Sequence, residues 1–294
     1  MSEFEGKVVI VTGAGGGLGR CHALSFAEQG ARVVVNDLGG SVHGDGESDM
    51  ADQVVDEIKA GGGEAVANKA SVSDPDGARS IVEDAVKAFG TVDILINNAG
   101  ILRDKSFKNM TLEEFDLVLD VHLRGSSYVT KAAWPIMYEK NWGRVVFTSS
   151  TSGIFGNFGQ ANYGAAKMAM LGFMNVLAIE GASHNIRVNC LAPGAATRMT
   201  AAVPGSTLDP DNPPPQMDPK LVTPAVLYMC SEDAPSATTI HASGGRFSRS
   251  QTYTNTGVSL GTDASFELLA ENASELLDMS EATPFDPLNR RRRG

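Results

Sequence analysis

The sequence predicts an α/β domain with a doubly wound parallel sheet of about seven strands, flanking helices and a C-terminal extension. Three observations lead to this prediction. Short runs of β-branched residues alternate along the chain with amphipathic stretches of helical length. The runs are continuously apolar, as is typical of parallel strands that helices cover on both faces. Glycine is abundant, with 32 residues in a chain of 294, and suits tight turns between strands and helices.

Six of the strands are expected at residues 7–11, 31–37, 65–70, 92–98, 144–150 and 186–192. The helix predicted after the second strand places Val54, Val55 and Ile58 on one face and ends at the glycines of 61–63. The helix after the third strand begins at Asp74. Its apolar face is expected to comprise Ile81, Val82, Ala85, Val86 and Phe89. This alternation implies right-handed βαβ units.

Regular structure is not expected at residues 201–220, which are rich in proline and polar residues. A loop of this length in a compact domain is usually a lid or is disordered, and we expect a lid over the substrate site near residues 201–220. A helix resumes after it, and residues 237–261 are rich in β-branched and turn-forming residues. One amphipathic piece follows at 264–279, and the final arginine run is interpreted as a solvated, mobile tail. We expect a domain at residues 1–250 and an extension with a basic tail at 251–294.

Composition argues against several classes of function. The formal net charge of −11 disfavours a nucleic-acid partner. The three cysteines, Cys21, Cys190 and Cys230, are far apart and lack metal-ligand spacing, so we expect no metal site and a reducing, cytoplasmic setting. The N-terminal segment lacks the apolar core of a signal peptide, and no apolar run is expected to reach the ~20 residues of a membrane span. We therefore expect a soluble protein without a membrane partner.

A glycine-rich turn, TGAGGGLG, follows the first predicted strand and opens the first helix. Its glycines let the chain approach a diphosphate closely, and the helix N-terminus supplies free N–H groups. Asp37 ends the second strand, where an acidic residue accepts hydrogen bonds from the adenosine ribose and repels a 2′-phosphate. No Lys or Arg occupies positions 14–16. We predict a Rossmann-type site for NAD rather than NADP, built from Gly13, Gly17, Leu18, Gly19 and Asp37.

The segment YGAAK places Tyr163 and Lys167 four residues apart, on one face of a helix. A free tyrosine has a pKa near ~10, and a nearby ammonium lowers this pKa by stabilising the phenolate. Ser150 ends the fifth predicted strand, at the edge where open α/β sheets bind ligands. Taken alone, Tyr163 is better explained as a half-buried core residue. Together with Ser150, Lys167 and the glycine turn, it is predicted to be a catalytic acid/base.

Six motifs occur together: TGAGGGLG, ND at 36–37, NNAG at 97–100, Ser150, YGAAK and PGAAT at 193–197. With them, roughly residues 5–250 resemble the short-chain dehydrogenase/reductases. The resemblance implies an enzyme that interconverts a secondary alcohol and a ketone, with the substrate oxygen between Ser150 and Tyr163. It also implies cofactor contacts from Ser71, Val72, Asn98, Ala99, Gly100, Tyr163, Lys167, Pro193, Gly194 and Thr197.

His122 departs from the family pattern. The family usually has Asn in V-N-L-x-G, where it holds a water of a proton relay, whereas this chain reads VHLRG. Two alternatives are open for this candidate catalytic residue. His122 either satisfies nearby backbone groups in a helix, or serves the relay by donating and accepting through its two ring nitrogens.

Longer segments, among them VVVNDLGG and NNAGILRDKSF, resemble the (3R)-hydroxyacyl-CoA dehydrogenase unit of the peroxisomal multifunctional β-oxidation enzyme. The resemblance implies a stand-alone relative of that unit and a 3-hydroxyacyl-CoA substrate. A hydroxysteroid or another bulky secondary alcohol is the alternative substrate, and a non-catalytic NAD-sensing scaffold is the alternative of another class. Basic candidates for the CoA phosphates, which are otherwise ordinary solvated charges, are Arg103, Lys105, Lys108 and Arg198.

The family resemblance further implies a homodimer or homotetramer. Pairing is expected through the helix that carries Tyr163 and the helix before the fifth strand. Residues 168–181 are apolar around most of the helix circumference, so a free outer face would be unfavourable.

Overall fold

The computed structural model describes residues 2–46, 48–203 and 205–288. An eight-stranded sheet forms the centre of the main domain, in the order β3-β2-β1-β4-β5-β6-β7-β8. Neighbouring strands from β3 to β7 are parallel, and the strand order reverses between β1 and β4, so the predicted doubly wound α/β fold is confirmed. The strands are β1 (Val8–Thr12), β2 (Arg32–Asn36), β3 (Glu64–Asn68), β4 (Ile94–Asn97), β5 (Gly143–Thr148), β6 (Ile186–Gly194), β7 (Thr239–Ser243) and β8 (Arg246–Ser250).

The sheet has one strand more than the expected seven. β8 follows β7 after a two-residue turn of Gly244 and Gly245, both with positive φ. Only antiparallel neighbours can be joined by so short a connection, so β8 extends the edge of the sheet as a hairpin. The β-rich composition of residues 237–261 indicated strands there, but it did not indicate how they pair.

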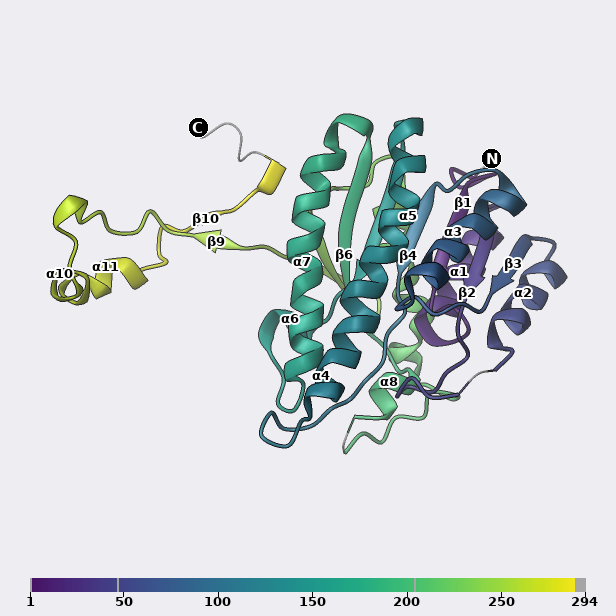
Figure 1. The fold of residues 1–294 in the computed structure, drawn as a ribbon, viewed down its shortest axis with the longest axis horizontal. Coiled ribbons are helices and arrows are strands. Elements are labelled where there is room, and N and C mark those ends of the chain that lie inside the picture. Colours follow the sequence, from purple (N-terminus) through teal and green to yellow (C-terminus); the bar gives the residue numbers. More distant parts are fainter. Residues whose placement is uncertain (1, 47, 204, 289–294) are drawn as a thin grey trace. The chain divides into compact units, whose positions relative to one another are not determined.

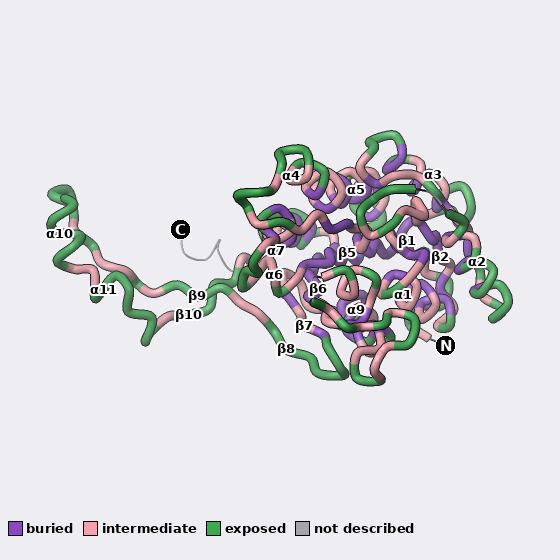
Figure 2. The backbone as a smooth tube through the Cα atoms, turned by 90° about the horizontal axis from the view of Figure 1, so that it is seen from below, coloured by how far each residue is buried: buried purple, intermediate pink, exposed green. Residues whose placement is uncertain are grey.

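Two layers of helices cover the sheet (Figure 1). Strand residues alternate between the layers: Val9 and Val11 of β1 pack with α1, α2 and α9, whereas Val8 and Ile10 pack with α3, α5 and α7. Figure 2 shows that the buried residues gather in the strands between these layers. The helices are α1 (Gly17–Glu28), α2 (Met50–Ala60), α3 (Pro75–Phe89), α4 (Leu112–Leu119), α5 (Gly125–Lys140), α6 (Thr151–Phe155), α7 (Ala161–Gly181), α8 (Arg198–Ala201) and α9 (Thr223–Cys230).

The helices predicted after the second and third strands form as α2 and α3. Asp74 caps α3 by accepting a hydrogen bond at 2.9 Å from a first-turn N–H group, and Gly90, at φ 86°, ends the helix. The predicted apolar face of α3 is wrong at Val86, which is 40% exposed. Ile81 and Ala85 lie on the buried stripe, whereas Val86 lies on the side that borders a surface groove next to α5.

Residues 201–220 are irregular, as predicted, in the part that the structure describes. Only the end of α8 and the 3-10 turns Pro215–Met217 and Pro219–Leu221 interrupt the loop. Proline fits the first position of such turns because its missing N–H would have no partner there. Helix α9 begins directly afterwards, at Thr223.

The C-terminal residues from Ser250 onward form a second compact unit, apart from the unit Met1–Arg249. In place of the single amphipathic piece that was predicted, it has two short helices, α10 (Phe266–Glu271) and α11 (Ala273–Leu277). Strands β9 (Tyr253–Thr254) and β10 (Thr283–Pro284) pair antiparallel. None of its residues 251–288 is buried, so this unit has no core of its own. The predicted arginine tail lies outside the described residues.

Helix α7 is the longest helix described, and it contradicts one expectation. The segment Ala161–His184 is long and apolar enough to cross a membrane by length and composition, although no such segment was expected. Its position explains the composition, because α7 packs against β6, α4 and α6 within the α/β domain. Core helices of such domains pass the same test.

Candidate active site

The site is built at the carboxyl ends of the central parallel strands. The glycine turn follows β1, the NNAG segment ends β4, Ser150 follows β5, and Pro193 and Gly194 end β6. In a doubly wound sheet these ends face the same edge, at the point where the strand order reverses. The fold therefore brings together segments that are far apart in the sequence.

The glycine turn packs closely against the NNAG segment. A Cβ on Gly13 would lie 2.8 Å from Ala99 Cα, and one on Gly19 would lie 2.2 Å from Gly13 O. The Asn98 amide donates hydrogen bonds of 3.0 Å to Thr12 O and Gly13 O. Because no side chain fits here, the backbone can approach a ligand closely, and the first N–H groups of α1 are left for an anion.

Asp37 is held at one end of the turn. One of its carboxylate oxygens accepts a hydrogen bond from Gly15 N at 2.7 Å, and the other accepts one from Gly39 N at 2.7 Å. Each oxygen retains a lone pair for a further donor. The carboxylate is thus fixed beside the glycine turn, where an adenosine ribose would lie.

A cavity of about 290 Å³ contains most of the predicted cofactor residues. Gly19, Tyr163, Lys167, Pro193 and Gly194 are not among its lining residues, and Gly194 contacts Ser243 of β7. The cleft has a glycine cradle, a free helix N-terminus and a fixed carboxylate, so its donor set fits a dinucleotide. The predicted residues that line it are Gly13, Gly17, Leu18, Asp37, Ser71, Val72, Asn98, Ala99, Gly100 and Thr197.

Ser150 and Tyr163 meet beside this cavity. Ser150 is the N-cap of α6, and its hydroxyl oxygen accepts a hydrogen bond from Ser152 N at 3.1 Å. Burial raises the pKa of Tyr163 to about 12, although a hydrogen bond with the Ser150 side chain lowers it. The negative charge of Asp104 raises it further. Tyr163 is therefore a neutral phenol at physiological pH in the free protein.

Lys167 is buried below Tyr163 on the same helix face. Its Nζ donates a hydrogen bond to Thr148 O at 2.7 Å and lies 5.5 Å from the Tyr163 ring centroid. Burial lowers the pKa of Lys167 to about 7. The expectation that an ammonium lowers the Tyr163 pKa thus fails in the free protein, because the ammonium is itself half lost near neutral pH and burial dominates.

His122 lies in a π-helical turn, Asp120–Arg124, between α4 and α5. Its Nε2 is 3.1 Å from Ile101 N and 2.8 Å from Ile101 O, and its ring meets Tyr163 edge-on at 5.3 Å between centroids. Burial, followed by the charge of Lys167, holds the His122 pKa well below 6.5, so the imidazole is neutral. Nε2 therefore contacts the backbone of Ile101, as the first of the two alternatives for His122 expected. Among the described residues Nδ1 is buried without a partner, and it is the nitrogen left for a proton relay.

Sequence reasoning missed the side chains that fix the first turn of α7. Asn162 donates to Arg103 O at 3.0 Å and to Glu114 O at 3.2 Å, and accepts from Tyr163 N at 2.7 Å. Gln160 donates to the Asp104 carboxylate at 2.6 Å. The available signal was a pair of amides, Gln and Asn, within the three residues before the tyrosine.

The segment that receives these hydrogen bonds also contacts the loop after Asp37. Leu102 N donates to Val42 O at 2.9 Å, and the Arg103 guanidinium lies 3.4 Å from the Asp45 carboxylate. On the other side, Lys105 N donates to Gly159 O at 2.9 Å. Residues 101–105 therefore join the cofactor side of the site to the start of the catalytic helix.

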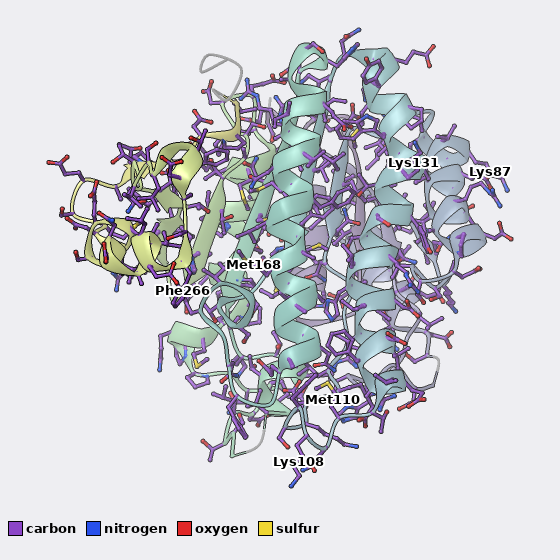
Figure 3. The ribbon with its side chains drawn as sticks, turned by 60° about the vertical axis from the view of Figure 1, so that its left-hand side comes forward. Lys87, Lys108, Met110, Lys131, Met168 and Phe266 are labelled. Carbon is purple, nitrogen blue, oxygen red and sulfur yellow. The ribbon has the colours of Figure 1, made fainter. Side chains whose placement is uncertain are left out.

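The predicted basic candidates are not brought together as one groove. Arg103 pairs with Asp45, and Lys105 pairs with Glu114 at 2.6 Å. Lys108, labelled in Figure 3, is exposed on the loop before α4. Arg198 lines the cofactor cavity instead.

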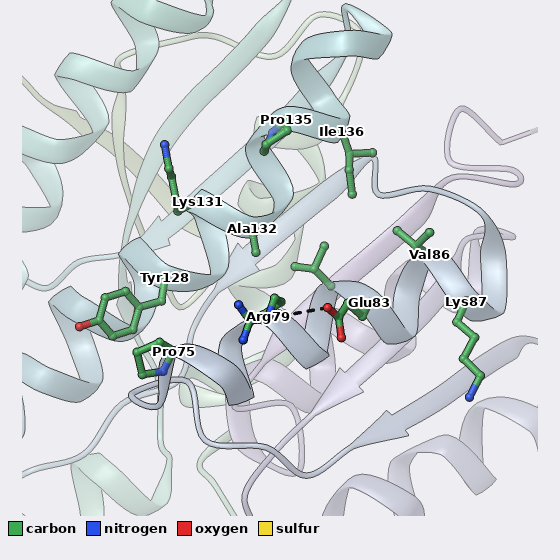
Figure 4. Close-up of a pocket in the computed structure, with 11 residues that line it drawn as sticks. Pro75, Arg79, Glu83, Val86, Lys87, Tyr128, Lys131, Ala132, Pro135 and Ile136 are labelled. Atoms are coloured by element: carbon green, nitrogen blue, oxygen red, sulfur yellow. Dashed lines mark ion pairs between the residues drawn. The ribbon is translucent and has the colours of Figure 1, made fainter.

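A larger cavity of about 650 Å³ lies elsewhere, between α3 and α5 (Figure 4). Its lining includes apolar residues and the Arg79–Glu83 ion pair at 3.8 Å, but none of the predicted catalytic residues. Among the described residues no group of three His, Cys, Asp or Glu could hold a metal ion, and the three cysteines are free thiols. The predicted catalytic residues instead gather at the carboxyl ends of the strands.

Comparisons with known proteins agree with this geometry. The sequence model of the short chain dehydrogenase family matches residues 7–206. A putative short-chain type dehydrogenase/reductase of Mycobacterium tuberculosis is 47% identical over 96% of this chain and 98% of its own length. The crystal structure of a short chain dehydrogenase from Mycobacterium avium superimposes with a TM-score of 0.80 at 39% identity, covering 94% of this chain and 96% of the other.

Multifunctional enzymes form a second group of relatives. Peroxisomal multifunctional enzyme A of Dictyostelium discoideum is 55% identical over 79% of this chain, but the match covers 51% of that enzyme, so the chain spans about half its length. The predicted relationship to the dehydrogenase unit of such enzymes is thereby confirmed. The chain belongs to the short-chain dehydrogenase/reductase family, whose members are oxidoreductases that typically use NAD(P).

Proposed function

We propose that the protein is an NAD-dependent dehydrogenase that interconverts a 3-hydroxyacyl-CoA and the 3-ketoacyl-CoA. One observation carries the oxidoreductase part of the proposal. Ser150, Tyr163 and Lys167 converge at the carboxyl end of β5, beside a cleft whose glycine cradle fits a dinucleotide. The sequence segments that resemble the hydroxyacyl-CoA dehydrogenase unit support the thioester substrate.

In the proposed mechanism the substrate oxygen lies between the hydroxyls of Ser150 and Tyr163. Alcohol oxidation requires the phenolate form of Tyr163, which accepts the hydroxyl proton; burial makes this form scarce at neutral pH in the free protein, because it raises the pKa of Tyr163 to about 12. Ser150 donates a hydrogen bond to the substrate oxygen as it becomes a carbonyl. The bound nicotinamide supplies the hydride acceptor. Lys167 binds the nicotinamide ribose, and Nδ1 of His122 continues the path of the proton away from the site. In ketone reduction Tyr163 donates the proton.

NAD is preferred to NADP in this proposal because of Asp37. Its carboxylate is fixed by Gly15 N and Gly39 N and cannot turn away from the ribose that it faces. Both ribose hydroxyls can donate to it, whereas a 2′-phosphate would be repelled. Ser71, Val72 and Thr197 line the same cavity. The family resemblance assigns the first two to the adenine and Thr197 to the nicotinamide.

Two further proposals concern the oligomeric state of the protein and its cellular compartment. Met168, labelled in Figure 3, and Val176 leave an apolar stripe on the outer face of α7, with exposures of 47% and 52%. We propose that this stripe pairs two copies of the chain, and that residues 201–220 form the lid over the substrate. The free thiols suit the reducing cytoplasm, where we propose that the protein acts.

The test of the activity compares substrates and one variant. NADH consumption is followed with a 3-ketoacyl-CoA, with the same acyl group on a short pantetheine mimic, and with a ketosteroid. The CoA thioester should react fastest, and Tyr163→Phe should abolish turnover while leaving NADH binding nearly unchanged, because only the proton donor is lost. A faster ketosteroid would overturn the substrate assignment. NADH binding without consumption across the panel would favour the sensing scaffold.

A further inference from the structure

Arg198 lies against the glycine turn and not in a substrate groove. It is the first residue of α8, and Thr197 before it caps that helix by accepting from Thr200 N at 3.3 Å. A Cβ on Gly17 would be 3.5 Å from Thr197 Cγ2, and one on Gly16 would be 3.6 Å from Arg198 Nη2. The guanidinium is thus beside the residues that open α1.

The guanidinium lacks a carboxylate partner among the described residues. Its hydrogen-bonding contact there is with the Met50 sulfur, 3.7 Å from Nη1, and a thioether is a weak acceptor. Other arginines of the domain are paired, such as Arg20 with Glu57 and Arg103 with Asp45. Arg198 also lines the cofactor cavity. The Arg198 side chain is exposed to solvent, so its fork of donors on the wall of this cleft is available to an anion.

We propose that Arg198 binds the diphosphate of the dinucleotide beside the glycine turn. The inference deepens the proposed function, because it adds a binding residue to the same cofactor site. The N–H groups at the start of α1 and the planar guanidinium, which lies next to Gly16, would bind neighbouring oxygens of the diphosphate.

Two other phosphates compete for this assignment. A 2′-phosphate would have to lie next to the Asp37 carboxylate, which is fixed by Gly15 N at 2.7 Å, so this source is disfavoured. The phosphates of a CoA substrate are the source that the sequence first suggested. Arg198 faces Gly16 and Met50 at the cofactor cleft, so the cofactor diphosphate is the nearer anion.

The position of Arg198 would also connect cofactor binding to the lid proposed at residues 201–220. Arg198 begins α8, and the irregular residues 201–220 follow directly. A diphosphate that binds Arg198 would therefore anchor the base of the lid. Substrate should then bind better after the cofactor than before it.

The test measures binding and not only turnover. Arg198→Gln and the matched control Arg79→Gln, whose guanidinium pairs with Asp76 on α3 and does not line the cofactor cavity, are titrated with NADH by fluorescence and with ADP and adenosine by competition. The dissociation constants of NADH and ADP should rise about tenfold or more for Arg198→Gln, and that of adenosine should not change. The Arg79→Gln values should stay within about twofold of the parent.

Three outcomes would overturn the proposal. Weaker binding of NADPH alone would assign Arg198 to a 2′-phosphate. Unchanged cofactor affinity with a raised KM for 3-ketoacyl-CoA, but not for the pantetheine mimic, would assign it to CoA. Unchanged NADH and ADP affinities in both Arg198→Lys and Arg198→Gln would show that Arg198 does not bind the diphosphate. If the glutamine variant does not fold, the lysine variant is used for this measurement. A parent protein that binds NADH without reducing any ketone would contradict the proposed function, whereas the contrast between ADP and adenosine would still test Arg198.

Discussion

Replacing Asn162 by alanine should destabilise the protein and misplace the catalytic tyrosine at the same time. The Asn162 side chain is fully buried in the first turn of α7. It donates to the carbonyls of Arg103 and Glu114, and its oxygen accepts from Tyr163 N, an N–H group of the first helical turn that has no partner within the helix. Truncation therefore removes three hydrogen bonds and leaves Tyr163 N without a partner, whereas Glu114 O still accepts a backbone hydrogen bond within α4.

The expected loss follows from these three hydrogen bonds. A typical intramolecular hydrogen bond contributes about 1 kcal/mol, and a buried group left without a partner makes the loss larger, so Asn162→Ala should lower the free energy of unfolding by about 3 kcal/mol or more. The loop of residues 101–105 would also lose the hydrogen bond that joins Arg103 O to the first turn of α7. Because Tyr163 is the next residue, kcat should fall even where the protein is fully folded.

Denaturant unfolding and steady-state kinetics measure the two effects. Asn175→Ala is the matched control, since Asn175 is on the same helix, is only partly buried, and makes no side-chain hydrogen bond within the described part of the chain. The control should change the free energy of unfolding by less than about 1 kcal/mol. A similarly small loss for Asn162→Ala, with unchanged kcat, would refute the idea that this amide positions the tyrosine.

Three further predictions concern charge. Asp37→Ala should narrow the ratio of kcat/KM for NAD over NADP, since it removes both ribose hydrogen bonds and a repulsion; an unchanged ratio would contradict the assignment. Asp104→Asn should shift the pH midpoint of alcohol oxidation to lower pH, because the Asp104 charge raises the pKa of Tyr163, and Asp116→Asn on the exposed face of α4 should not. The stability of the cofactor-free protein should rise by about 1–2 kcal/mol from pH 7 to 8.5, because burial lowers the pKa of Lys167 to about 7 and the unfolded chain binds the extra proton. Lys167→Met should flatten this rise in denaturant titrations.

The sequence predicted the parts of the fold that depend on local pattern. Continuous apolar runs located β1 to β6, and capping signals located α2 and α3, because these features depend on neighbours in the chain. The hairpin at β8 was missed because its two glycines indicate a turn but not the sheet edge onto which it folds. Val86 was misplaced because the boundary of a buried stripe depends on the helix that packs beside it.

The site residues likewise divide into those that a local sequence pattern could identify and those that depend on distant partners. Motif residues such as Asp37 and Tyr163 could be found because their types and spacing carry the chemistry. Asn162 and Gln160 could not be assigned, since their partners, Arg103 and Asp104, lie more than fifty residues earlier in the chain. The lowered pKa of Lys167 likewise depends on how deeply α7 packs against β6, which no local pattern reports.

The segment of residues 101–105 has a practical consequence for altering cofactor preference. On one side, Leu102 N donates a hydrogen bond to Val42 O and Arg103 pairs with Asp45. On the other side, Asn162 donates to Arg103 O and Lys105 N donates to Gly159 O. An exchange of the loop after Asp37 for one from an NADP-dependent relative would remove supports from the tyrosine helix as well as changing the ribose pocket. A graft that keeps residues 42–45 and alters only positions 37–40 should change the cofactor while leaving the rate of proton transfer intact.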